Sequence, residues 1–155
     1  MKKIDLKALL ISVAISLGAG GLAALFTGAG SEFYDSIERP ALSPPSWVFP
    51  VVWTILYILM GVSAYIIYES SCGNKKTALK VYLAQLAVNF VWSIVFFNAK
   101  AFLFAFILIM VLWLLIIAMI ALFHRCRPIA AYLQVPYFLW VTFAAYLTWS
   151  IYYLN

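Results

Sequence analysis

The chain of 155 residues has few acidic side chains, and none of them lies inside its long apolar segments. It contains five Asp and Glu residues, one histidine and two cysteines. Secondary transporters and proton pumps generally rely on carboxylates within the membrane, so a carboxylate-dependent exporter is disfavoured. His124 alone does not provide a paired-histidine haem site, and two cysteines with one histidine do not form a metal site. The serines lack the histidine and carboxylate partners of a hydrolase triad, so no catalytic residue is assigned.

Charge of either sign is scarce, and its distribution leaves five long uncharged stretches. Charged residues make up 10% of the chain and hydrophobic residues 67%, which excludes a soluble domain. Each stretch has about the 20 residues that a helix needs to cross a bilayer. We therefore predict an all-α integral membrane protein, a single transmembrane domain over residues 1–155 built as a bundle of five transmembrane helices. The predicted helices cover residues 6–27, 47–68, 79–98, 101–123 and 130–154, with a long first loop over 28–46.

The first apolar segment has a second interpretation as a signal peptide, because Lys2, Lys3 and Lys7 precede it. The run Ala8–Phe26 is longer than the usual apolar core of a signal peptide. We therefore expect this segment to be retained as the first helix.

Basic residues predict the orientation of the bundle. Those at the N-terminus, in the second loop and in the fourth loop fall on one side and make up eight of the ten. The other side has only Arg39 and Lys100. We predict the N-terminus inside and the C-terminus outside, in a bacterial plasma membrane. The net charge of +5 follows from this topology and implies the lipid bilayer as partner, with no nucleic acid.

Cys72 and Cys126 both fall in predicted inside loops. A reducing compartment keeps thiols unpaired, so we expect no disulfide between them.

Proline is concentrated in one segment, RPALSPPSWVFPVVWTILY, which begins at Arg39 and holds four of the chain's six prolines. Proline fixes φ and removes a backbone donor, so the segment predicts a stiff loop that feeds a helix. Asp35 and Arg39 are spaced i, i+4 and are expected to form an ion pair if the region is briefly helical. A role for Arg39 in meeting an anionic ligand is the alternative.

Four further segments carry packing predictions. The first helix is rich in Gly and Ala, which predicts a close seam either within the bundle or between two copies. The fourth helix is almost purely apolar and is expected to face lipid. The short connection Asn98–Ala101 predicts a tight antiparallel pair of helices. Pro136 is expected to bend the fifth helix.

Aromatic and polar side chains from three predicted helices are expected at a common depth, where they would suit a large flat ligand. The opposing interpretation is that these aromatic residues are core filler or interfacial anchors. The set is Trp53, Tyr57, Asn89, Trp92, Tyr137 and Trp140.

Three sequence blocks resemble the translocator protein family, whose bacterial members are called tryptophan-rich sensory proteins. The blocks are FYDSIERPALSPPSWVFPVVWTILYILMG, QLAVNFVWSIVFF and PYFLWVTFAAYL, in family order between about Phe33 and Leu154. The resemblance implies a five-helix bundle, often a homodimer, that binds porphyrins and drug-like ligands such as isoquinoline carboxamides or benzodiazepines. Animal members also bind cholesterol, but their C-terminal motif ends in a basic residue that is absent after Tyr152.

The family pocket lies under the first loop, and its residues transfer to this chain by motif. No cofactor is required, and porphyrin is implied as a ligand. The resemblance implies as ligand-binding residues Tyr34, Pro44, Pro45, Trp53, Tyr57, Asn89, Phe90, Trp140 and Ala144.

The leading hypothesis is therefore a receptor-like membrane protein that binds porphyrins and aromatic drugs. Light-dependent degradation of the porphyrin, with Trp53 and Trp140 as candidate electron donors, is an enzymatic alternative. Transport of porphyrin or small apolar ligands is a third hypothesis.

Overall fold

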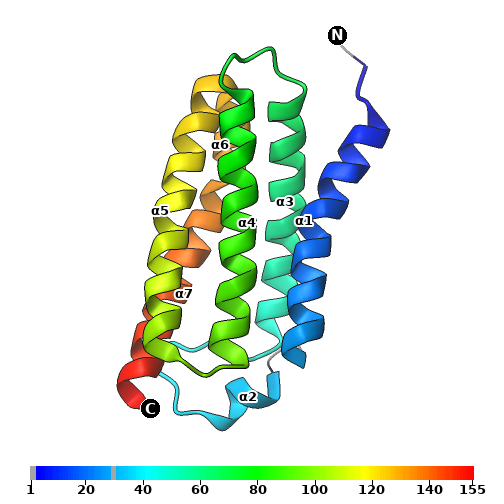
Figure 1. The fold of residues 1–155 in the computed structure, drawn as a ribbon. Coiled ribbons are helices and arrows are strands. Elements are labelled where there is room, and N and C mark those ends of the chain that lie inside the picture. Colours follow the sequence, from blue (N-terminus) through cyan, green and yellow to red (C-terminus); the bar gives the residue numbers. More distant parts are fainter. Residues whose placement is uncertain (1–2, 29–30) are drawn as a thin grey trace.

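Five membrane-spanning helices form an antiparallel bundle (Figure 1), as predicted. The computed structural model describes residues 3–28 and 31–155. Lys2 and residues 29–30 of the predicted first loop lie outside the described residues. The spans are α1 (Leu6–Thr27), α3 (Val48–Tyr68), α4 (Lys75–Phe97), α5 (Phe102–Cys126) and a last span made of α6 (Pro128–Tyr132) and α7 (Val135–Leu154).

The two ends of the bundle differ in what covers them. The N-terminus lies at the end that also holds the connection between α3 and α4, whereas the C-terminus lies at the opposite end (Figure 1). The first loop, which contains the short helix α2 (Ser31–Ser36), crosses that opposite end beneath the helices. We call the end with the connection between α3 and α4, which contains Cys72, the cysteine end. We call the opposite end, which the first loop covers, the loop end. An odd number of crossings places the two termini on opposite sides, whichever side is inside the cell.

Most helix boundaries lie within two residues of the sequence prediction, and the two that differ by more are both at the cysteine end. α4 begins at Lys75 instead of residue 79, and α5 continues to Cys126 instead of residue 123. Long basic side chains extend from a helix end toward the headgroups, so charge does not mark where the helix stops. The last span is interrupted before Val135, close to Pro136, which occupies the first turn of α7.

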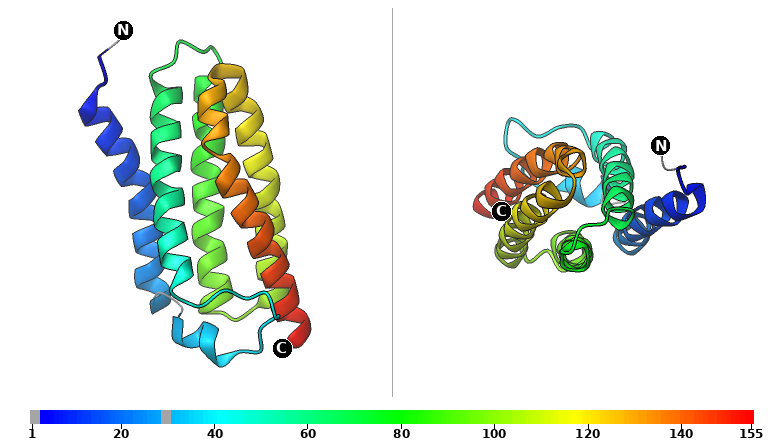
Figure 2. Two further views of the ribbon diagram at one scale, coloured as in Figure 1. Left: turned by 180° about the vertical axis from the view of Figure 1, so that it is seen from behind. Right: turned by 90° about the horizontal axis from the view of Figure 1, so that it is seen from above.

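α1 packs against α3 through small side chains and two interhelical hydrogen bonds. Ser12 Oγ donates to Gly61 O at 2.7 Å, and Ser16 Oγ donates to Tyr57 O at 2.7 Å. Gly20 faces α3, whereas Gly18 faces open space. α1 touches only one side of the bundle and stands at its edge (Figure 2). The seam within the bundle is therefore present, while a contact between copies stays a prediction.

The expectation that the fourth span faces lipid was wrong for one of its two sides. α5 packs between α4 and α7 through residues spaced three and four apart: Ala105, Ile109, Leu112, Ile116, Met119 and Phe123, all buried. Its opposite side, including Leu103, Ile107 and Leu114, is exposed. Because lipid is as apolar as the bundle interior, the two faces carry the same residue types and the sequence shows no stripe.

The expectation that the cysteines stay unpaired was also wrong. Cys72 and Cys126 form a disulfide at the cysteine end, with their Cα atoms 5.3 Å apart. α4 and α5 are joined by the tight turn at Asn98–Ala101, where Lys100 has a φ of 53°, and run side by side to the cysteine end. The residues before α4 and at the end of α5 therefore meet there. The Cα–Cα distance of 5.3 Å lies within the range that disulfides require. The sequence prediction rested only on the reducing compartment and did not include the distance between the two cysteines.

Candidate ligand-binding cavity

A cavity of about 330 Å³ lies in the loop-end half of the bundle, between α1, α3, α4 and α7. Helix α2 closes it at the loop end with the side chain of Tyr34. We call it the cavity. Its lining is Leu17, Gly20, Gly21, Ala23, Ala24, Thr27, Tyr34, Phe49, Pro50, Trp53, Thr54, Tyr57, Trp92, Ser93, Phe96, Phe97, Ala144, Leu147, Thr148 and Ile151. None of these side chains carries a charge.

Two stacked aromatic pairs form one wall of the cavity. Trp53 stacks on Tyr57 within α3, with ring centroids 5.6 Å apart, because the two residues are one helical turn apart. Trp92 stacks on Phe96 in α4 in the same way, at 5.5 Å. The rings of Trp53 and Trp92 are 6.5 Å apart, so the two pairs form a continuous aromatic surface.

Small residues form the facing walls. Gly20, Gly21 and Ala24 of α1 and Ala144 of α7 line the space with little or no side chain. A large residue at any of these positions would occupy part of the volume. The cavity therefore exists because α1 and α7 present small residues toward an aromatic wall.

A buried polar cluster lies behind the aromatic wall, toward the cysteine end. Tyr137 Oη donates to Gln85 Oε1 at 2.6 Å and accepts from Asn89 Nδ2 at 3.2 Å. All three residues are at most 1% exposed. The ring of Tyr137 is 6.2 Å from that of Trp53, so the cluster supports the wall. Asn89 Nδ2 therefore donates its hydrogen bond to Tyr137 inside the bundle, on the far side of the wall from the cavity.

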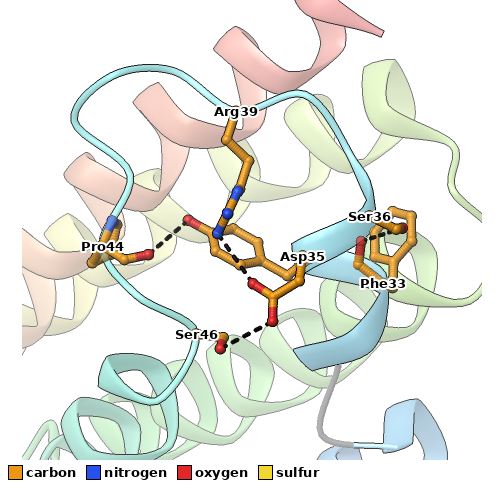
Figure 3. A network of polar contacts seen from close by, with 7 residues as sticks. Phe33, Asp35, Ser36, Arg39, Pro44 and Ser46 are labelled. Atoms are coloured by element: carbon orange, nitrogen blue, oxygen red, sulfur yellow. Dashed lines mark hydrogen bonds and ion pairs between the residues drawn. The ribbon is translucent and has the colours of Figure 1, made fainter.

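The first loop is held over the cavity by polar contacts at both of its sides. Asp35 and Arg39 form the predicted ion pair at 3.2 Å, and Ser46 Oγ donates to the other Asp35 oxygen at 3.3 Å (Figure 3). Tyr34 Oη donates to Pro44 O at 3.3 Å. At the C-terminal end of α7, the Asn155 side chain bonds both the N–H and the C=O of Glu38. The loop is thus tied to itself and to the last helix.

The structure brings together four of the nine residues that the sequence assigned to the site. Tyr34, Trp53, Tyr57 and Ala144 line the cavity. Pro44 and Pro45 lie further out, in a separate hollow on the loop.

The other three residues lie near the cavity without lining it. Asn89 belongs to the polar cluster behind the aromatic wall. Phe90 packs edge-on against Phe26 at 6.0 Å, and Trp140 packs against Phe49 at 5.7 Å.

Sequence reasoning missed the contribution of α1 and part of that of α4. Gly20 and Gly21 were interpreted only as part of a packing seam, and neither Leu17 nor Phe96 was assigned to the site. The signal that was available is the glycine pair in a helix otherwise rich in large apolar residues. Its partner could not be found without knowing which helix α1 packs against.

The model of the TspO/MBR family matches residues 11–154, almost the whole chain. The chain belongs to the TspO/MBR family. It is 36% identical to the tryptophan-rich protein TspO of Chlorobaculum tepidum over 159 aligned positions, which cover 99% of this chain and 98% of that protein. It is 39% identical to the tryptophan-rich sensory protein of Cereibacter sphaeroides over 80% of this chain and 77% of that one.

Animal members of the TspO/MBR family are also similar to this chain. The translocator protein of Ovis aries is 33% identical over 80% of this chain and 75% of its own length. The family membership that the sequence blocks predicted is confirmed.

Proposed function

We propose that this protein is a membrane receptor that binds porphyrins and other flat aromatic ligands, such as isoquinoline carboxamides, in the cavity under the first loop. The observation that carries the proposal is an uncharged cavity with a continuous aromatic wall, closed by a tied loop. Its volume of about 330 Å³ lies at the lower end of the range of drug-sized ligand sites, about 300–1,000 Å³. Membership of the TspO/MBR family supports the same proposal.

The aromatic wall would supply most of the affinity. Ring systems stack in offset or edge-on arrangements at centroid distances of about 4.5–7 Å, and Trp53 and Trp92 present their rings to the cavity. Thr54, Ser93 and Thr148 also line the cavity. Each hydroxyl donates to the backbone carbonyl four residues earlier, so its oxygen is left to accept a hydrogen bond from a ligand donor. Pro44 and Pro45 would stiffen the loop above without touching the aromatic body of the ligand.

Ligand titrations in lipid nanodiscs test this proposal. Protoporphyrin and an isoquinoline carboxamide are titrated separately while tryptophan fluorescence is followed, and each is then displaced by the other. We expect saturable binding with one competing site. Trp53→Ala should weaken both ligands at least tenfold, equivalent to about 1.4 kcal/mol. Trp53→Phe keeps an aromatic ring and should weaken them less.

The matched control is Trp149→Ala. Trp149 is exposed, packs against Phe106 and lies outside the cavity lining, so both affinities should be unchanged. Equal losses in the Trp53 and Trp149 variants would contradict the assignment of the cavity as the binding site.

Light-dependent porphyrin degradation is a second candidate, favoured by the position of one tryptophan. Of the two proposed electron donors, Trp53 lines the cavity, whereas Trp140 is separated from it by Phe49. Illuminated samples of the wild type should bleach bound porphyrin faster than Trp53→Phe does, at equal occupancy. Bleaching at the rate seen with an unrelated membrane protein would exclude this activity.

A further inference from the structure

The cavity offers nothing to a charged group, and this limits how a porphyrin acid can sit in it. All the lining side chains are uncharged. An ionised carboxylate taken out of water without a partner loses several kcal/mol or neutralises instead. The aromatic body of such a ligand therefore fits the cavity, while its carboxylate needs a separate place. This inference rests on the proposed function.

A second space lies on the loop beside the cavity, and a basic side chain lines it. It measures about 480 Å³, and we call it the loop hollow. Its lining is Asp35, Arg39, Pro40, Ser43, Pro44, Pro45 and Ser46. Arg39 and Lys100 are the two basic residues at the loop end of the bundle, and of these two Arg39 lines the hollow.

Tyr34 lines the cavity and contacts two residues that line the loop hollow, Arg39 and Pro44. Its ring lines the cavity, and the Arg39 guanidinium carbon lies 4.7 Å from the centre of that ring. Its hydroxyl donates to the carbonyl of Pro44, which lines the hollow. That bond measures 3.3 Å, longer than most O–H···O bonds, so the ring is held mainly by its packing against Phe49, at 4.8 Å between ring centroids. Rotation of this one side chain would connect the two spaces.

Arg39 has donors to spare for a second carboxylate. Its contact with Asp35 uses one nitrogen, Nη1, out of a guanidinium with five N–H donors. The Asp35 side chain is 54% exposed, and exposed pairs of this kind contribute about 0–1 kcal/mol. Little free energy is therefore lost when Arg39 leaves Asp35 and pairs with the carboxylate of a ligand. Asp35 can turn to solvent when Arg39 takes a new partner.

Ser43 provides a second donor in the same hollow. Its Oγ is buried and has no hydrogen-bond partner within the part of the chain that the structure describes. Buried hydroxyl groups are nearly always paired, so an unpartnered one beside a guanidinium fits a ligand oxygen. A guanidinium and a hydroxyl together match the acceptors of a carboxylate.

We propose that the loop hollow is a subsite for a carboxylate of an amphiphilic aromatic ligand. Arg39 and Ser43 receive the carboxylate, and the aromatic body occupies the cavity on the other side of Tyr34. The first loop then selects flat ligands that carry an acid side chain over otherwise equal neutral ones.

Two porphyrins with the same ring system test the subsite: protoporphyrin and its dimethyl ester, titrated in nanodiscs of zwitterionic lipid at low salt. We expect wild-type protein to bind the acid about tenfold more tightly than the ester. Arg39→Gln should reduce affinity for the acid five- to tenfold and leave that for the ester unchanged. Asp35→Asn removes the competing carboxylate and should increase affinity for the acid two- to fivefold.

Two variants and one neutral ligand complete the test. Lys100→Gln removes the other cation at this end, which lies over the Phe33 ring, and should change neither affinity. Arg39→Lys keeps the charge and should retain most of the preference for the acid. Binding of an uncharged isoquinoline carboxamide to Arg39→Gln, at wild-type affinity, establishes that the variant is folded.

The outcomes separate this inference from the proposed function. If Arg39→Gln weakens acid and ester equally, or weakens neither, the subsite is overturned while aromatic binding in the cavity stands. If wild-type protein binds neither porphyrin nor the carboxamide saturably, both the proposed function and the subsite are overturned.

Discussion

Gly20 of α1 lies directly against the ring of Tyr57 in α3, and a Cβ atom added at Gly20 would overlap ring atom Cε2. Both residues line the cavity. Tyr57 is stacked on Trp53, so its ring cannot shift without moving the aromatic wall. The glycine therefore determines the position of the wall as well as the approach of the two helices.

Replacing Gly20 should damage ligand binding more than folding. In Gly20→Ala the Tyr57 ring must turn away from α1, which narrows the cavity and disturbs the stack on Trp53. We expect affinity for an isoquinoline carboxamide to fall three- to tenfold, equivalent to about 0.7–1.4 kcal/mol. Gly18→Ala is the matched control, because a Cβ there meets nothing within 4 Å and Gly18 does not line the cavity. Equal affinities of the two variants would contradict the prediction.

Gly61 is predicted to be a stability determinant at the contact between α1 and α3. A Cβ there would come within 2.5 Å of Val13 Cα and 3.0 Å of the Ser12 carbonyl oxygen, both backbone atoms. Gly61→Ala should lower the free energy of unfolding by about 1–3 kcal/mol, because two helices must separate to make room. Thermal unfolding in nanodiscs measures this. Gly18→Ala faces open space and should be neutral, so a loss as large there would refute the explanation.

The hydroxyl of Tyr137 is expected to stabilise the bundle centre. Tyr137→Phe leaves Gln85 Oε1 and Asn89 Nδ2 without their partner in a region that is at most 1% exposed. Leaving buried polar groups unpaired costs about 1–3 kcal/mol, which unfolding in denaturant or heat should detect. Tyr153→Phe serves as the control, since Tyr153 is 81% exposed. An unchanged stability of Tyr137→Phe would show that the two amides find other partners.

The disulfide is expected to stabilise the cysteine end. Cys72 and Cys126 are 54 residues apart in the sequence, and closing a loop of that size typically contributes about 2–4 kcal/mol. Reduction with dithiothreitol should therefore lower the Tm of the wild type by several degrees. The double variant Cys72→Ser, Cys126→Ser should unfold at the lower temperature with or without reductant. Two titratable thiols in the untreated protein would contradict the prediction.

Much of the fold followed from where charges and prolines stand in the chain. A bilayer excludes charge, so the uncharged stretches marked the spans to within a few residues, and the tight turn at Asn98–Ala101 paired α4 with α5. The ion pair between Asp35 and Arg39 followed from their i, i+4 spacing, although α2 ends at Ser36, before Arg39. The inside and outside assignment of the termini stays a prediction from basic residues.

The site was predictable only in part, because its residues come from helices whose neighbours the sequence does not specify. Trp53, Tyr57 and Ala144 were assigned from their motifs and do line the cavity. Asn89 and Trp140 were assigned in the same way, but Asn89 lies in the polar cluster behind the aromatic wall and Trp140 lies behind Phe49. A rotation of a fraction of a helical turn decides which side chains face the cavity. The wall from α1 was missed for the same reason.

The sequence by itself determined that this protein is a five-span membrane bundle without buried acid, and it identified the family. Only the tertiary structure decided that α5 packs inside on one face, that Cys72 meets Cys126, and that Gly20 and Tyr57 set the width of the cavity. The physical reason is that lipid and protein interior are equally apolar. Hydrophobicity therefore reports which residues enter the membrane, whereas shape complementarity between helices determines which of them meet.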